Sequence, residues 1–476
     1  MTHRRPLIDA LTAFQQQQPI SFHVPGHKNG ELSALPPEMR SALPYDLTEV
    51  TGLDDLHYPE EAIQEAQQLL AEAYGADQSF FLVNGSTVGN LAMVYAACQE
   101  GDTVIVQRNA HKSIFHALEL AKARPVYVAP EWDEESLTAS GVAFADITAA
   151  VMAYPEAAAV ILTYPNYYGM ATAGLKETIA FCQSQGMAVL VDEAHGAHFQ
   201  IGDPFPASAL AYGANVVVQS AHKTLPAMTM GSFLHIQGDL VNREKIKKYL
   251  RMLQSSSPSY LIMASLDDAR AFVQTYSQPD IRYFKDKRKQ FIRGLKSIPR
   301  LEVFESDDPL KLMLRVEGYN GFQLKEQLEK AGIHAELADP YQVLLIMPLL
   351  KQIHAYPFAE VRKRVKEAIR ELEQYPGDAL AVKMPIQQAI SVPDISYAQM
   401  DTETREWIPY TASVGRISAG MVVPYPPGIP LIVPGEKWTL EKLEGLADYL
   451  ATGAQIQGEH RLEEKLICVL PEIKRQ

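Results

Sequence analysis

A lysine that follows an apolar run is the first candidate for chemistry in this sequence. The stretch 218–224 ends a predicted strand with two hydroxyl residues around the pair His222-Lys223. A side chain just past the carboxyl end of a strand lies where open α/β sheets bind their ligands. If its surroundings keep the amine neutral, Lys223 can form a Schiff base with a carbonyl group. The alternative is an ordinary solvated lysine on the surface.

An acid ends a second apolar run. Residues 187–191 are continuously apolar and lead into Asp192. A buried carboxylate needs a cationic partner, and a protonated pyridine nitrogen could be that partner. The pairing would keep the pyridine ring of a cofactor protonated and therefore an effective electron sink. A helix N-cap and a salt-bridged aspartate stay open as alternatives. A metal site at Asp192, His195 and His198 is disfavoured because no recognised ligand spacing accompanies these residues.

Two further stretches fit a flat anionic ligand. Residues 82–90 place glycines, Ser86 and Thr87 before a helical run at 91–97, so backbone N–H groups and the helix dipole would attract an anion. The pattern matches neither the P-loop nor the dinucleotide fingerprint, so ATP and NAD are not implied, and such hydroxyls also cap helices without a ligand. His111 stands at a predicted strand-to-helix junction, where it could stack on an aromatic ring or serve as a capping or surface histidine.

These residues need a scaffold that brings strand ends together, and the sequence predicts one. From about residue 103 to residue 236, short apolar runs alternate with helical patterns, which is typical of a parallel α/β sheet. Each candidate lies at a predicted edge of this sheet. The predicted strands are 103–107, 125–129, 159–163, 188–192, 215–219 and 232–236, and the helices between them include 111–122 and 175–185.

The pattern changes beyond about residue 270. Helical segments rich in Lys and Arg, at 284–296 and 359–374, bracket strand-like pieces at 310–316 and 343–347. This predicts a smaller α/β domain, and a third unit is predicted to begin near Val382. We therefore expect a large domain over 1–270, a small α/β domain over 271–380 and a C-terminal domain over 381–476.

The bulk composition narrows the class of protein. Of 476 residues, 47% are hydrophobic and 21% are charged, the profile of a globular protein. The net charge of −14 disfavours nucleic acid as a partner, because phosphate binding needs clustered Lys and Arg. Three scattered cysteines favour a reducing compartment, and no apolar run is long enough to span a bilayer. A cytoplasmic protein without a membrane partner is expected.

Specific strings along the chain resemble a known family. They stand at 22–28 (FHVPGHK), 52–57 (GLDDLH), 220–223 (SAHK), 253–258 (LQSSSP), 415–417 (GRI), 424–430 (PYPPGIP) and 434–436 (PGE). Together they resemble the ornithine/lysine/arginine decarboxylase family, enzymes that use pyridoxal phosphate (PLP) and have the aspartate-aminotransferase fold. The resemblance spans nearly the whole chain and is to the shorter members, which lack the N-terminal wing domain of the large acid-inducible enzymes.

The resemblance assigns roles to the candidate residues. Lys223 would hold PLP as a Schiff base, Asp192 would pair with the pyridinium nitrogen, and His111 would stack on the ring. The phosphate would be held by two loops of the same chain and, across a homodimer, by a serine of the neighbouring subunit. The residues concerned are Ser86, Thr87, Ser220 and His222, with Ser256 or Ser257 from the neighbour.

By the same resemblance, Glu336 would face the distal cation of the substrate. A desolvated guanidinium or ammonium needs a carboxylate partner. The alternative is that Glu336 has no role in substrate binding. Apolar and polar residues alternate here: Ile333, Ala335 and Leu337 are apolar, whereas His334 and Glu336 are polar. That pattern puts Glu336 on the wet face of an ordinary strand.

The expected reaction is decarboxylation of arginine, lysine or ornithine to agmatine, cadaverine or putrescine, with a proton returned to the substrate by Lys223 or a nearby histidine. Two departures from the family pattern border the expected site. Tyr164 and Asn166 stand where relatives commonly have Asn and Thr, and Met230 stands where many have Gln. Another PLP reaction on this fold, by an aminotransferase or an aldolase, and a catalytically inactive regulator remain as alternatives.

Overall fold

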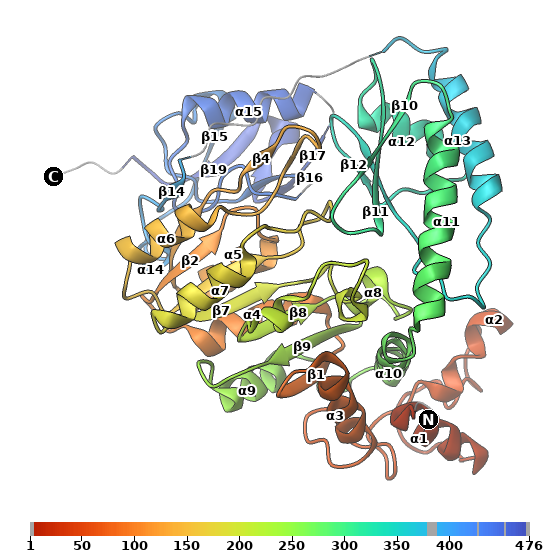
Figure 1. Ribbon diagram of the computed structural model, residues 1–476. Coiled ribbons are helices and arrows are strands. Elements are labelled where there is room, and N and C mark those ends of the chain that lie inside the picture. Colours follow the sequence, from red (N-terminus) through yellow and green to blue (C-terminus); the bar gives the residue numbers. More distant parts are fainter. Residues whose placement is uncertain (1–3, 378–387, 426–427, 452–453, 473–476) are drawn as a thin grey trace. The chain divides into compact units, whose positions relative to one another are not determined.

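The computed structural model describes residues 4–377, 388–425, 428–451 and 454–472 (Figure 1). The chain divides into two compact units, each built from two stretches of sequence. Unit 1 comprises residues 1–97 and 188–277, and unit 2 comprises residues 98–187 and 278–476. Among the described residues, no helix combines the length and the apolar character needed to cross a bilayer.

Unit 1 is built on strands that are largely apolar. β7 (Ala188–Asp192), β8 (Val216–Gln219) and β9 (Ser232–Ile236) are buried at every position, as expected for strands covered on both faces. With β1 (Gln78–Leu82) they lie in the order β1-β9-β8-β7. β7 and β8 are parallel, so their carboxyl ends meet at one edge.

Helices accompany the strands of unit 1, and several of them contact these strands. They are α1 (Pro6–Gln16), α2 (Pro37–Arg40), α3 (Ala62–Tyr74), α4 (Gly85–Ala97), α8 (Ala221–Thr224), α9 (Arg243–Leu253) and α10 (Tyr260–Gln274), with 3₁₀ turns η1 (Leu43–Tyr45), η2 (Phe199–Ile201) and η3 (Ala209–Tyr212). α4 packs against β8 and β9 and contacts α9, whereas α1, α3 and α10 contact one another. The amino end of α4 therefore belongs to the same unit as the ends of β7 and β8.

The first strands of unit 2 have the order β6-β2-β3-β14. β2 (Thr103–Gln107) is parallel to β3 (Arg124–Val128) and to β6 (Ala159–Thr163), whereas the short β14 (Ile390–Ser391) is antiparallel to β3. The accompanying elements are α5 (Lys112–Ala121), α6 (Phe144–Ala153), α7 (Leu175–Ser184) and the hairpin of β4 (Trp132–Asp133) and β5 (Thr138–Ala139).

A second sheet of unit 2 is antiparallel, with the order β10-β11-β13-β12. Its elements are β10 (Leu301–Glu305), β11 (Lys311–Val316), β12 (Leu337–Ala338), β13 (Val343–Ile346), α11 (Gln278–Lys296), α12 (Gly321–Lys330) and α13 (Phe358–Leu372). α11 and α13 lie side by side, and α11 contacts β10 (Figure 1). The predicted small α/β arrangement of helices and strands is confirmed within unit 2.

The C-terminal part of unit 2 has an apolar cluster of its own. Trp438, 1% exposed, packs there with Ile432, Leu446 and Val469. The elements are β15 (Glu406–Pro409), β16 (Val422–Tyr425), β17 (Gln455–Gly458), β18 (His460–Arg461), β19 (Leu466–Val469), α14 (Tyr397–Met400), α15 (Leu440–Ala451) and the 3₁₀ turns η4 (Tyr410–Ala412) and η5 (Leu462–Glu464).

The predicted strands at 103–107, 159–163, 188–192 and 232–236 are confirmed residue for residue. The strands predicted at 125–129 and 215–219 differ by one residue at their ends, as β3 (Arg124–Val128) and β8 (Val216–Gln219). Two larger details are wrong. β9 runs antiparallel to β8, because their connection holds only the short α8 instead of a crossover helix. α4 begins at Gly85 and not at Leu91. The division at residues 270 and 380 stays a prediction, and residue 380 and Val382 lie outside the described residues.

Gly89 lets α4 approach the strands of unit 1. A Cβ at this position would lie 2.8 Å from Leu82 Cδ1 and 2.8 Å from Val218 Cγ1. We expect Gly89→Val to lower the free energy of unfolding by about 1–3 kcal/mol, because the crowded side chains must move apart. Urea denaturation measures the loss. Gly26→Val is the control, since its Cβ would meet nothing within 4 Å; equal losses in the two variants would contradict the explanation.

Candidate active site

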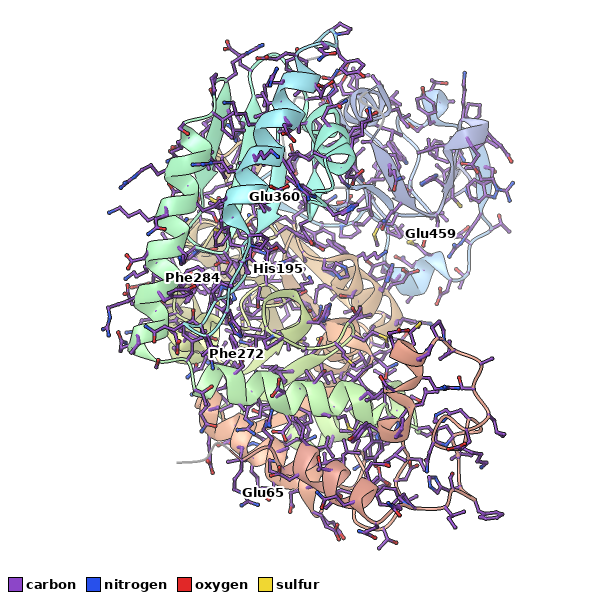
Figure 2. All side chains as sticks on the ribbon, turned by 90° about the vertical axis from the view of Figure 1, so that its right-hand side faces the viewer. Glu65, His195, Phe272, Phe284, Glu360 and Glu459 are labelled. Carbon is purple, nitrogen blue, oxygen red and sulfur yellow. The ribbon has the colours of Figure 1, made fainter. Side chains whose placement is uncertain are left out.

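Lys223 lies in α8, directly after β8, and is half-buried. Its Nζ is 3.0 Å from Nε2 of His195, a residue only 3% exposed. His195 is labelled in Figure 2. An ammonium can donate to an unprotonated Nε2, and a protonated Nε2 can donate to a neutral amine. The contact therefore holds a proton between the two nitrogens. Sequence reasoning weighed His195 only as a metal ligand, although its place three residues after Asp192 was a signal that it shares this strand end.

The carboxylate of Asp192 is held from two sides. The residue is 2% exposed, its Oδ2 accepts from Asn90 Nδ2 at 2.8 Å, and its Oδ1 accepts from the Ala194 N–H at 3.1 Å. Sequence reasoning missed Asn90. The available signal was its position one helical turn after Ser86, which puts both side chains on the same face of α4.

The amino end of α4 forms a cradle lined by hydroxyl groups. Gly85 has a φ of +77°, and a Cβ there would meet nothing within 4 Å. Ser220 Oγ donates to Ser86 Oγ at 2.9 Å, so two of the predicted phosphate ligands come together. Thr87 follows in the same turn and is exposed. Unpaired N–H groups of a first turn beside hydroxyls suit a phosphate.

His222 and Met230 support this cradle through backbone contacts. His222 Nδ1 lies 2.9 Å from the Gly231 carbonyl oxygen, so this nitrogen donates to the backbone and not to an anion. The Gly85 N–H donates to the Met230 carbonyl at 2.9 Å, with Met230 in the left-handed region at φ +77°. Because the main chain makes this bond, the departure from Gln at position 230 leaves it intact.

His111 lies in unit 2 and is the N-cap of α5. Its Nδ1 accepts from the Ser113 N–H at 3.2 Å, which places the ring proton on Nε2. The capping function weighed from the sequence is therefore present. Stacking on a cofactor ring stays a prediction.

Asn166 builds the turn that follows β6. Its Oδ1 accepts from the N–H groups of Tyr168 and Met170, both at 3.0 Å. A threonine, which relatives commonly have there, also offers an oxygen that can cap a turn. The departure at Asn166 therefore keeps the local structure, and Tyr164 is buried beside it, 3% exposed.

Ser256 and Ser257 are exposed on the loop before α10. The Ser255 N–H donates to Asn84 Oδ1 at 3.2 Å, so this loop lies beside the start of the cradle in its own chain. Contact with the phosphate of a second subunit stays a prediction.

Glu336 lies in unit 2 next to β12 and is exposed. Its N–H donates to the Leu344 carbonyl at 3.1 Å, and the following Leu337 is buried. The strand-like alternation is therefore confirmed. A role for Glu336 in reading the substrate stays a prediction.

Glu193, the neighbour of Asp192, is fully buried on the other side of the strand end. It accepts from Ser208 Oγ at 2.8 Å, from the Ala209 N–H at 2.7 Å and from Gln219 Nε2 at 2.7 Å. Burial raises the pKa of Glu193 to about 8 even though these hydrogen bonds lower it. Sequence reasoning missed Glu193. It directly follows Asp192, and the sequence gives no sign that the two carboxylates face opposite sides of the strand end.

A row of polar side chains continues from Glu193 across the strands. Because Gln219 donates its amide hydrogen to Glu193, its oxygen accepts from His235 Nε2 at 3.2 Å. The other ring nitrogen of His235 then accepts from Ser79 Oγ at 2.7 Å. Burial lowers the pKa of His235 to about 3, so the ring stays neutral as this arrangement requires. The row ties β1, β9 and β8 to the end of β7.

Comparison with known proteins adds the family. A family model described as Orn/Lys/Arg decarboxylase, major domain, matches residues 5–302, and one described as Orn/Lys/Arg decarboxylase, C-terminal domain, matches residues 379–460. The chain belongs to the Orn/Lys/Arg decarboxylase family. The resemblance drawn from the motifs is confirmed.

Two relatives of this decarboxylase-family chain match it over nearly their whole length. It is 43% identical over 482 residues to the uncharacterized protein YaaO of Bacillus subtilis, covering 98% of each chain. It is 34% identical over 493 residues to arginine decarboxylase of the same organism, covering 99% of each. The crystal structure of the Francisella novicida lysine decarboxylase superposes with a TM-score of 0.82 at 19% identity, covering 98% of this chain and 81% of that one. This likeness confirms the predicted α/β fold.

The raised pKa of the buried Glu193 makes the stability of this family member depend on pH. Between about pH 4.3, the ordinary glutamate value, and the pKa of about 8, the folded chain keeps a proton that the unfolded chain has lost. The stability that Glu193 contributes therefore falls as pH rises, by at most about 1.4 kcal/mol per pH unit. Glu193→Gln cannot titrate, so relative to wild type it should gain stability between about pH 5 and pH 8.

Urea unfolding at a series of pH values measures this difference. The matched control is Glu72→Gln, an exposed glutamate on α3. Its stability relative to wild type should not change with pH. A pH-independent difference for Glu193→Gln as well would mean that Glu193 is ionised throughout the range.

Proposed function

We propose that this family member decarboxylates a basic amino acid with PLP as its cofactor, and that arginine is its preferred substrate. The observation that carries the proposal is the contact of Lys223 with His195, beside a doubly held Asp192, where β7 and β8 end. The 34%-identical arginine decarboxylase supports the choice of arginine.

The residues of unit 1 fit PLP in three respects. The cradle at the amino end of α4 suits a phosphate, and Lys223 offers an amine for the aldehyde. The buried carboxylate of Asp192 suits a protonated ring nitrogen, because a buried charge needs a partner. When bound, PLP supplies a sink for the electrons that the departing carboxylate leaves behind.

The side chains around the cofactor then have separate tasks. Asn90 and the Ala194 N–H keep Asp192 oriented. Lys223 and His195 hold the proton that the product needs at Cα, and their 3.0 Å separation lets either nitrogen carry it. His111 would stack on the ring.

We propose further that the protein works as a homodimer in the cytoplasm. Ser256 and Ser257 are exposed on the loop beside the cradle, where a second subunit can reach them. The three cysteines are buried thiols, in keeping with a reducing compartment: Cys98, Cys182 and Cys468.

Lys223→Ala tests the proposed chemistry. Wild type should show a visible absorbance band that borohydride removes, and it should release CO₂ and agmatine from arginine in equal amounts. The variant should lose the band and fall in turnover by orders of magnitude, because it removes the amine proposed to link the cofactor. Lys245→Ala, on the exposed side of α9, is the control. A keto acid in place of agmatine would make the enzyme an aminotransferase.

Glu336→Gln tests the proposed reader of the distal cation. A charge-assisted hydrogen bond is worth about 1.5–3 kcal/mol, so KM for arginine should rise roughly tenfold or more while PLP binding stays unchanged. Steady-state kinetics with arginine, lysine and ornithine side by side measure the effect. The control is Glu326→Gln, an exposed glutamate on α12. An unchanged KM would assign Glu336 to the solvated face of its strand.

A further inference from the structure

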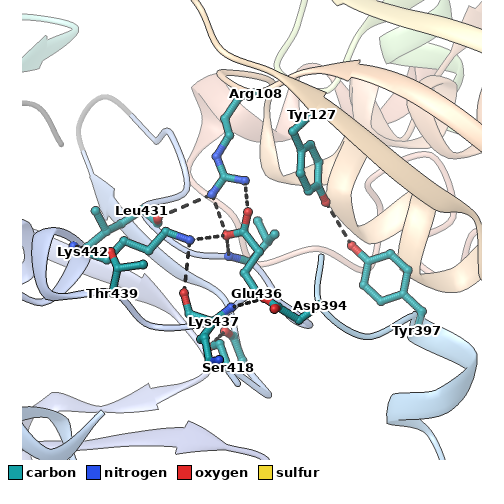
Figure 3. Close-up of polar contacts among 12 residues, drawn as sticks. Arg108, Tyr127, Asp394, Tyr397, Ser418, Leu431, Glu436, Lys437, Thr439 and Lys442 are labelled. Carbon is teal, nitrogen blue, oxygen red and sulfur yellow. Dashed lines mark hydrogen bonds and ion pairs between the residues drawn. The ribbon is translucent and has the colours of Figure 1, made fainter. Parts of the chain in front are cut away.

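A buried ion pair stands next to the His111 segment in unit 2. Arg108 follows β2 directly and precedes His111 by three residues, and its side chain is 5% exposed. Its two terminal nitrogens donate to the two carboxylate oxygens of Glu436 (Figure 3). The bond from Nη2 to Oε2 is 2.7 Å long. The two residues are 328 positions apart in sequence. The pair therefore joins the strand end before His111 to the C-terminal part of the chain.

Glu436 is itself held in one orientation. Lys442 Nζ donates to the Oε2 of Glu436 at 3.0 Å (Figure 3). The Val433 N–H donates to the same oxygen at 3.2 Å. Burial acts to raise the pKa of Glu436, but the charges of Arg108 and Lys442 outweigh it, so the pKa lies below its usual range. One ionised carboxylate thus faces two cations.

Hydrogen bonds hold Arg108, Asn109 and His111 between β2 and α5. The Arg108 N–H donates to the Val128 carbonyl at 2.8 Å. Asn109 accepts from Gln107 Nε2 and donates to the Ser140 carbonyl, both at 2.8 Å. His111 then closes the segment by capping α5. The Arg108 fork adds a side-chain anchor at the start of the segment that ends at the His111 ring.

For this pair, direction is the contribution to test, because a buried ion pair is weak evidence for added stability. Apolar residues of similar volume avoid the desolvation of two charges and often leave a protein equally stable. What they do not reproduce is the planar, two-bond geometry between guanidinium and carboxylate. This pair would therefore be expected to matter for the position of the segment it anchors.

We propose that Glu436 is a positioning residue, which fixes residues 108–111 through Arg108 and so sets the direction of the His111 ring. This gives the C-terminal part of the chain a task in positioning the His111 segment of unit 2. The inference rests on the proposed function to the extent that His111 is taken to face the cofactor.

Three variants separate positioning from stability. Glu436→Gln leaves Arg108 and Lys442 without their carboxylate. The double variant Arg108→Met/Glu436→Leu removes both charges of the pair, while Lys442, 22% exposed, can reach water. The control is Asp401→Asn, which breaks the exposed Lys122–Asp401 ion pair of 2.9 Å at the other end of α5.

Hydrogen exchange in the cofactor-free protein gives the first measurement. The Ser113 amide is protected by its bond to His111 Nδ1. In Glu436→Gln and in the double variant, the peptide covering residues 108–115 should exchange roughly tenfold faster. In the double variant the thermal midpoint should stay within about 3 °C of wild type. Asp401→Asn should match wild type in both.

The loaded enzyme gives the second measurement. In the double variant, PLP should dissociate roughly tenfold faster and kcat should fall by a similar factor, with KM for arginine unchanged. The visible circular dichroism of the bound cofactor should change as well, because it reports the asymmetry of the groups around the ring. Asp401→Asn should keep the wild-type spectrum.

Two results would overturn the proposal. One is wild-type exchange of residues 108–115 in the double variant, which would show that the pair does not fix this segment. The other is a double variant whose kcat, cofactor spectrum and stability all match those of wild type, which would show that the pair has a purely structural role. If the wild-type protein bound no PLP, the proposed function would fail, and the exchange data would still decide whether Glu436 fixes the segment.

Discussion

In the parallel pair β7–β8, Asp192 lies opposite Val218, so both strands end at the same level. The acid that ends β7 and the lysine that follows β8 are therefore brought to one edge by backbone hydrogen bonds alone. α4 completes this edge, because Gly89 lets it pack closely enough for Asn90 to reach Asp192 and for Ser86 to meet Ser220. A shift between β7 and β8 would separate Asp192 from Lys223.

Buried polar groups then hold the edge in place. Asp192 and Glu193 are adjacent, but they are satisfied by different elements, α4 on one side and the η3 segment with β8 on the other. In unit 2 the pair Arg108–Glu436 does the same for the segment that leads to His111. Each of these groups would be costly to bury without its partners, so each partner restricts where the backbone can lie.

Much of the fold could be predicted because the buried strands are short apolar runs with clear ends. β2, β6, β7 and β9 were located residue for residue for this reason. The direction of β9 was not predictable from its composition, which is the same for either orientation. The first turn of α4 was missed because Gly85, Ser86 and Thr87 are weak helix formers, and packing on β8 overrides their preference. Lys223 and Asp192 could be chosen from their strand ends, whereas Asn90, Glu193 and the partner of Arg108 depend on contacts that no local pattern records.

The row Ser79–His235–Gln219–Glu193 has a single polarity, since each member donates toward Glu193. Replacing one member by a residue with the opposite hydrogen-bonding sense would leave its neighbour facing donor to donor or acceptor to acceptor. Such a mismatch is corrected only when the adjacent strand changes too. Over evolutionary time these four positions should therefore vary as a block, with viable sequences reached through paired substitutions and not through single ones.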